Sequence, residues 1–168
     1  MSRKSHPLRV ERLESRQLLA AYSLLDLGFP PGAESPRSYT YDINDQGWVA
    51  GHAAEASLWT PDAANAPTGS MTTLGTLGGM FSGAEAVNDQ GQAVGWAYTT
   101  SGALNPALFD SGTVTNLNPA VASGVATDLN DDATLVVGYY DVYDSGLEEW
   151  ESSAFLCDRG TFVELNEV

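Results

Sequence analysis

The chain has 168 residues, which is enough for one domain with a buried core. Seven Lys and Arg residues against 22 Asp and Glu residues give a net charge of −15, and beyond residue 20 only Arg37 and Arg159 are basic. This acidic balance excludes binding of nucleic acid or of an anionic membrane by the part of the chain after residue 20. No apolar run approaches the roughly 20 residues of a transmembrane helix, and a single cysteine, Cys157, excludes an internal disulfide.

Residues 1–20 are a separate basic segment that we expect to be a disordered sorting or export arm. Its apolar run is short and interrupted, so it fits a Sec signal poorly. The run LESRQLL at residues 13–19 resembles the LEPR-XLL motif near the start of large exported and surface proteins of some bacteria. Ser15 replaces the proline of that motif, and the matching residues are Leu13, Glu14, Arg16, Leu18 and Leu19. The resemblance implies an envelope or extracellular destination, not an activity.

The body of the chain, residues 21–168, is an internal repeat with a period of about 45 residues. A run with an Asn-Asp pair and a final glycine occurs at 43–51, 87–95 and 129–138. We place the repeats at about 22–70, 71–112 and 113–160, with the start of a fourth at 161–168. The repeated structural positions are Asn44, Asp45, Gly51, Asn88, Asp89, Gly95, Asn130, Asp131 and Gly138.

Each repeat predicts four short strands, so the expected fold class is all-β. The first strand ends at the Asn-Asp pair, whose turn places glycine in the left-handed region, and the second runs into the repeated glycine. The third holds Trp59, Phe109 or Cys157. The fourth holds one of a series of leucines, and hairpin signals precede it at 110–113 and 158–161. The leucines are Leu27, Leu74, Leu117 and Leu165.

Four strands in about 45 residues is the size of a β-propeller blade, although three repeats also suit a β-trefoil-like closure. The stretch from Leu74 to Gly95 resembles the HAF family of extracellular repeats, and Ala154-Phe155-Leu156 resembles the strand that names the family, with Ser153 in place of its histidine. Membership would imply a secreted or surface β-repeat protein without a shared catalytic residue. The resemblance favours the propeller.

Few residues suggest chemistry. We expect His52 to be a strand residue among aromatic neighbours and Cys157 to be a buried apolar thiol. Asp128, Asn130 and Asp132 have the spacing of a calcium loop, but Ala133 and Tyr139 stand where its glycine and glutamate belong, so a recurrent turn explains them better. The acidic insert 141–151 is expected to be a solvated loop between two strands, with a cation-bearing or carbohydrate partner as the alternative.

We therefore expect an exported or surface-associated, non-enzymatic β-repeat protein that is a structural or binding module. We assign no catalytic, cofactor or metal residue, and the expected partner is a protein or a glycan. The alternative is a carbohydrate-binding or polysaccharide-active domain that uses Trp48, Trp96 and Trp150. One leucine strand is in surplus, either 22–27 or 162–165, so we expect self-association into a six-bladed ring, favoured by salt, or a trefoil-like closure.

Overall fold

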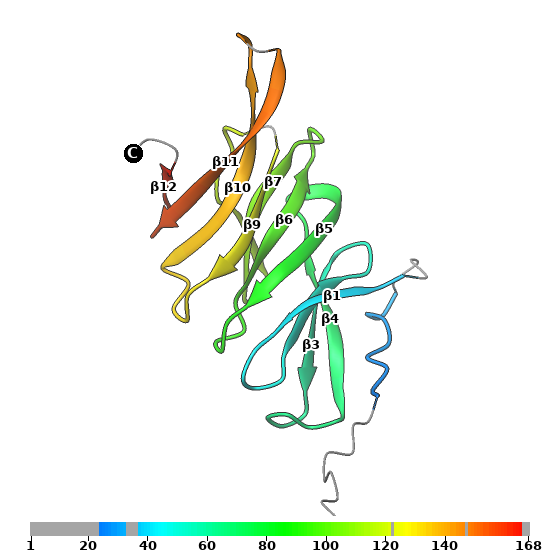
Figure 1. The fold of residues 1–168 in the computed structure, drawn as a ribbon. Helices are drawn as coiled ribbons and strands as arrows, with labels where there is room; N and C mark the ends of the chain where they lie inside the picture. Colours follow the sequence, from blue (N-terminus) through cyan, green and yellow to red (C-terminus); the bar gives the residue numbers. More distant parts are fainter. Residues whose placement is uncertain (1–23, 33–36, 122, 147, 166–168) are drawn as a thin grey trace, which may run out of the picture.

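The computed structural model describes residues 24–32, 37–121, 123–146 and 148–165. These residues form twelve strands and contain no helix that could span a membrane. The strands make three antiparallel sheets of four, here called sheets A, B and C in chain order (Figure 1). Sheet A consists of β1 (Tyr39–Ile43), β2 (Val49–His52), β3 (Ala56–Pro61) and β4 (Gly69–Gly75). Sheet B consists of β5 (Gly78–Val87), β6 (Ala93–Thr99), β7 (Leu104–Asp110) and β8 (Thr113–Asn116). Sheet C consists of β9 (Gly124–Leu129), β10 (Leu135–Asp144), β11 (Glu149–Asp158) and β12 (Thr161–Glu164).

The expected all-β architecture is confirmed, and each sheet is a simple meander whose neighbouring strands are consecutive in the chain. Sheet B lies between the other two, because β1, β2 and β3 pack on β5 while β5, β6 and β7 pack on β9 (Figure 1). The three sheets do not close on themselves. Closure as a propeller ring or as a trefoil is therefore not confirmed.

Two hydrophobic layers hold the sheets together. The layer between sheets A and B is rich in alanine, including Ala50, Ala84 and Ala97, and its large member is Phe109. The layer between sheets B and C contains Val94, Val136 and Phe155. Small side chains let two sheet faces approach closely, and each buried Phe contributes about 1.5–3 kcal/mol. Among the described residues, sheet B thus borders both of these layers.

The repeated glycines lie where the first two strands of each sheet cross most closely. In each repeat a side chain at this glycine would collide with a carbonyl oxygen of the first strand, beside a β-bulge that leaves one first-strand residue without a partner. The glycines are Gly51, Gly95 and Gly138, the carbonyl groups belong to Tyr39, Gly83 and Val125, and the bulged residues are Tyr41, Glu85 and Thr127. A bulge brings the backbone of one strand toward its neighbour, so the three glycines serve one repeated structural purpose.

The predicted hairpins at the third and fourth strands are confirmed. Asp110 pairs with Thr113 and Asp158 pairs with Thr161, which leaves two-residue loops. Both loop residues have positive φ in each case, 49° and 79° at Ser111-Gly112 and 46° and 81° at Arg159-Gly160. Two such residues in succession match the right-handed twist of the strands that they join.

The leucine strands differ from the expectation in two ways. Leu74 lies in β4, but Leu117 and Leu165 follow the last residues of β8 and β12, although their amides still bond to Pro106 and Ala154. Thr161–Glu164 is the fourth strand of sheet C, so the structure places it in the third repeat rather than at the start of a fourth. Leu27 lies in a segment without regular secondary structure that joins no ladder. The surplus strand is therefore absent from the described residues.

Candidate functional site

The Asn-Asp pairs form the same turn in all three repeats, and the asparagine organises it. Oδ1 of Asn44 accepts bonds from the amides of Gln46 and Trp48, and Oδ1 of Asn88 accepts from those of Gln90 and Gln92, at 2.8–3.1 Å. In the third turn, which is one residue longer, Oδ1 of Asn130 accepts from Leu135. An asparagine side chain that accepts from the amides ahead of it is a common turn stabiliser.

The left-handed position of these turns is filled differently in the third repeat. Gly47 and Gly91 have φ of 84° and 78°, as predicted, whereas Ala133 takes the corresponding place with a φ of 50°. An alanine in this region is strained, because its Cβ crowds the backbone. The third turn therefore keeps the left-handed position of the other two at some cost in stability.

The asparagine amides also connect each turn to the turn of the next repeat, which the sequence reading did not anticipate. Nδ2 of Asn44 donates to the carbonyl oxygen of Asn88 at 2.9 Å, and Nδ2 of Asn88 donates to that of Asp131 at 2.9 Å. Gln46 adds a bond to the carbonyl oxygen of Asp89 at 3.3 Å. We call this series the asparagine ladder. The recurrence of Asn, rather than Asp, at this position was the sequence signal for the ladder. A turn of this kind uses only the side-chain oxygen, which leaves the side-chain amide of Asn available to a neighbouring turn.

A continuous series of ring contacts crosses from sheet A to sheet B. His52 lies at the junction, with its ring centre 5.2 Å from that of Tyr39, 5.5 Å from that of Tyr41 and 5.6 Å from that of Trp96, each edge to face. The series continues through Tyr98 to Phe81. We call these six residues the aromatic row. The expectation that His52 is a strand residue among aromatic neighbours is confirmed.

The aromatic row is exposed at both ends. Tyr39, Tyr41 and Phe81 keep about half of their surface in contact with solvent. In β5 the pairing runs from Gly78 opposite Thr99 directly to Ser82 opposite Ala97, so three residues lie opposite Tyr98 alone. This irregularity leaves Met80 with 79% of its surface exposed beside a groove of about 610 Å³. Bulges often redirect side chains in this way beside binding sites.

The electrostatics of the row centre on His52 and Glu85. Burial lowers the pKa of His52, and the nearby Glu85 carboxylate opposes that shift. Burial raises the pKa of Tyr41, and Glu85 adds to the effect. Glu85 also accepts a 3.0 Å bond from Nε1 of Trp96. Among the described residues, Nδ1 of His52 is a buried polar atom without a hydrogen-bond partner, so the neutral ring is the favoured form.

The acidic insert differs from the expected solvated loop. The ladder between β10 and β11 continues through it, pairing Asp141 with Ser152 and Tyr143 with Trp150, so most of the insert is regular hairpin. The rings of Tyr143 and Trp150 lie 5.4 Å apart, and 62% of the Trp150 surface is exposed. Val142, Tyr143 and Trp150 are residue types that favour strands, and cross-strand aromatic pairs stabilise such hairpins.

The three tryptophans do not form one surface. Trp48 is half-buried against the layer between sheets A and B, Trp96 belongs to the aromatic row, and Trp150 is on the β10–β11 hairpin. A shared sugar platform is therefore not formed by these residues.

Cys157 is buried in the layer between sheets B and C, as expected, and burial raises the pKa of its thiol. Asp132, one of the three residues with calcium-loop spacing, accepts bonds from the amide and hydroxyl of Thr134. Within the described part of the chain, no group of three His, Cys, Asp or Glu side chains could hold a metal ion.

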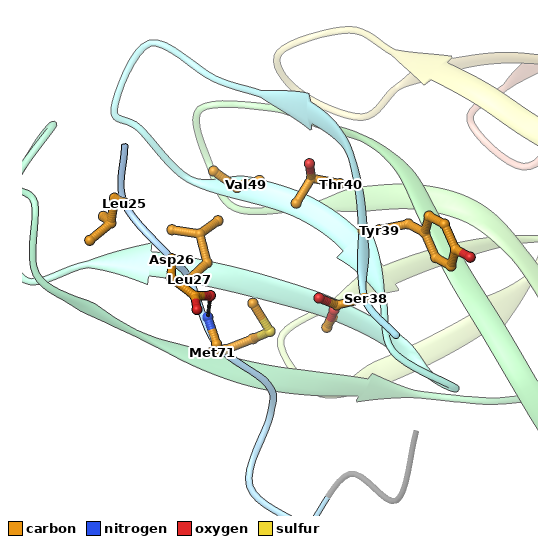
Figure 2. A pocket seen from close by; sticks show the side chains of 11 residues that line it. Leu25, Asp26, Leu27, Ser38, Tyr39, Thr40, Val49 and Met71 are labelled. Atoms are coloured by element: carbon orange, nitrogen blue, oxygen red, sulfur yellow. Dashed lines mark hydrogen bonds between the residues drawn. The ribbon is translucent and has the colours of Figure 1, made fainter. Parts of the chain in front are cut away.

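A segment without regular secondary structure, before β1, covers the face of sheet A that points away from sheet B. Leu25 and Leu27 line a cavity of about 270 Å³ together with Val49 and Met71, and the segment runs across the strands in Figure 2. Ala50 and Leu58 point the other way, into the layer shared with sheet B. The arm of residues 1–20, with its Leu13–Leu19 motif, lies outside the described residues.

A scan against protein-family models, a search of curated proteins and a search of solved structures each found no match to the chain. The two family resemblances therefore stay predictions.

Proposed function

We propose that the chain is an exported, non-catalytic β-repeat module that binds another protein through the aromatic row. The observation that carries the proposal is the exposure of Tyr39, Tyr41 and Phe81 in one connected series, extended by Met80. Exposed aromatic and methionine side chains are enriched where proteins meet, and a rigid sheet holds them in place at little entropic cost.

The ring geometry favours a protein over a sugar at this surface. A sugar stacks on the flat face of an exposed ring, whereas the rings around His52 meet edge to face, at 82–89° between their planes. Such a surface offers ring edges, ring faces and gaps between them, which suits the irregular apolar side chains of a polypeptide.

Selection from a phage-displayed random peptide library tests the proposal. Peptides enriched on the native chain should lose affinity about tenfold or more with Tyr41→Ala or Phe81→Ala, the loss typical of a central interface residue. The matched control is Tyr143→Ala, an equally exposed tyrosine outside the row. The proposal is wrong if no peptide is enriched or if the control reduces binding as much.

Carbohydrate binding is a second candidate, and the β10–β11 hairpin favours it. Trp150 is more exposed than any ring in the aromatic row and lies among carboxylates that could accept bonds from sugar hydroxyls. Glycan-array binding that is lost with Trp150→Ala and kept with Tyr41→Ala would support this candidate. Signal that survives Trp150→Ala would exclude it.

We also propose that the three sheets are blades of a β-propeller arc, as the HAF resemblance implies. Three separate meanders packed face to face support this arrangement over a trefoil, in which the repeats share one barrel. The proposed address is the cell surface or the medium, in line with the LEPR-XLL resemblance. Fractionation of cells that produce a reporter fused to residues 1–38 tests this location. The double variant Leu18→Ala, Leu19→Ala should keep the reporter inside the cells.

A further inference from the structure

The asparagine ladder ends at Asn130, whose side-chain amide has no acceptor in a further repeat. Asn44 donates to the turn of the second repeat and Asn88 to the turn of the third. Asn130, which occupies the same position in sheet C, turns its amide back to Oγ1 of Thr134 in its own turn, at 3.1 Å. The geometry that joins the sheets twice is thus present a third time without its acceptor.

The face of sheet C that points away from sheet B repeats the apolar half of the same interface. Ala50 and Val94 precede the repeated glycine in sheets A and B, and both are fully buried against the next sheet. The corresponding residue in sheet C is Val137, which is 38% exposed. Leu156, the counterpart of the packed Leu58 and Leu108, lines a depression of about 240 Å³ together with Val137 and Asn130.

The opposite end of the stack is already occupied by the chain itself. The segment around Leu27 covers the outward face of sheet A (Figure 2). Asn65, in the long loop between β3 and β4, donates from Nδ2 to the carbonyl oxygen of Asp45 at 3.0 Å. Asp89 and Asp131 receive their bonds from the preceding repeat at the same position. A head-to-tail second copy would therefore meet a covered face and an occupied acceptor.

We propose that the outward face of sheet C docks one further four-stranded repeat of the same type. Its first strand packs on Val137 and Leu156, and the carbonyl groups of its Asn-Asp turn accept from Nδ2 of Asn130. The two existing interfaces define this occupant: small residues in its first strand, and a turn that leaves carbonyl oxygens open to a neighbour. The inference does not depend on the aromatic row.

A fused repeat tests the proposal with material from the chain itself. Residues 77–118, which contain sheet B, are joined after Val168 of the full chain, and thermal unfolding is followed by circular dichroism. We expect one cooperative transition with a Tm about 5 °C or more above that of the unfused chain, because docking adds an interface to sheet C. An appended repeat that unfolds separately, or stays unfolded, would overturn the proposal.

Matched substitutions on β10 separate docking from general stabilisation. Val137→Asp should abolish the gain in the fused chain while changing the Tm of the unfused chain little, since the side chain is exposed there. Val142→Asp is the control, because Val142 is equally exposed on the same strand but beyond the interface positions. A gain that survives Val137→Asp contradicts the proposal. Light scattering could also contradict the proposal, by showing that the unfused chain is a dimer and that Val137→Asp makes it a monomer. A second copy of the chain would then be the occupant of this face.

Discussion

At the scale of single residues, the repeated glycines are the positions where backbone geometry restricts the sequence most. Gly95→Val would drive a side chain into the carbonyl oxygen of Gly83, so we expect a loss of about 1–3 kcal/mol in the free energy of unfolding. Urea denaturation measures it. Thr113→Val, at an exposed strand position, is the control and should stay within about 0.5 kcal/mol of the native chain. A neutral result at Gly51, Gly95 and Gly138 alike would undermine the close strand crossing.

The asparagine ladder can be measured by comparing two equivalent residues. Asn88 is buried, and its side chain bonds both within its own turn and to the carbonyl oxygen of Asp131, whereas the side-chain bonds of Asn130 stay within its own turn. We expect Asn88→Ala to cost about 1–3 kcal/mol and Asn130→Ala clearly less, because only the first change leaves carbonyl groups of another repeat unpaired. Equal losses in urea denaturation would mean that the bonds between repeats contribute nothing.

His52 should make stability depend on pH. Burial lowers its pKa below the usual 6.5, so the folded state favours the neutral ring. The resulting stability is present above pH 6.5 and is lost as the pH falls toward the lowered pKa. We expect the Tm of the native chain, relative to that of His52→Phe, to fall between pH 7.5 and pH 5.5. The phenylalanine keeps the ring contacts, so a parallel response of both proteins would show that His52 does not contribute.

At the scale of elements, the sequence predicted what repeats within the chain and missed what depends on stacking. Local backbone requirements allowed the prediction of the turns at Asn44 and Asn88, the glycine positions and the two-residue hairpins. Each of these features depends only on a short stretch of sequence. The bulge at Tyr41 and the donor role of Asn88 toward the next turn were missed, because they exist only once strands pair and sheets pack. The exposure of Met80 was missed for the same reason, since it follows from an irregular register rather than from composition.

The acidic insert shows how charge misled the sequence reading. Asp141, Asp144 and Glu151 suggested a solvated loop, yet the segment continues the ladder of β10 and β11. An exposed hairpin can contain several carboxylates when cross-strand pairs of apolar or aromatic residues stabilise it, as the pair Tyr143 and Trp150 does. The strand propensity of the aromatic and β-branched residues was therefore a better guide here than net charge.

The N-terminal elements should contribute unequally to stability. Residues 1–20 lie outside every repeat anchor, so their deletion should leave the Tm within a few degrees. Deletion of residues 1–30 should lower it, because that change also removes Leu25 and Leu27, which line a cavity with Val49 and Met71 of sheet A. Thermal unfolding followed by circular dichroism compares the two. A large loss on the shorter deletion would mean that the basic arm packs on the sheets.

At the scale of the whole molecule, the two ends of the stack differ, and this difference governs association. The six-bladed ring expected from the sequence would require sheet C of one copy to meet sheet A of another. The outward face of sheet A is covered by the segment around Leu27, and the carbonyl oxygen of its Asn-Asp turn already accepts from Asn65. Charge also opposes contact, since the described residues hold only Arg37 and Arg159 as basic side chains. We therefore expect the full chain to be a monomer at low and at high salt.

Deleting residues 1–30 together with Asn65→Ala would give the chain two complementary ends and should let it associate head to tail. Association should strengthen as salt rises past roughly 0.15 M, where the Debye length falls below about 8 Å and repulsion between the acidic bodies weakens. Light scattering coupled to gel filtration, at both salt concentrations, measures the mass. Val137→Asp in the same background is the control and should restore the monomer, because it disrupts the sheet C side of the contact. Association of the full chain, or a monomeric double variant at high salt, would show that the covered end of sheet A is not what limits assembly.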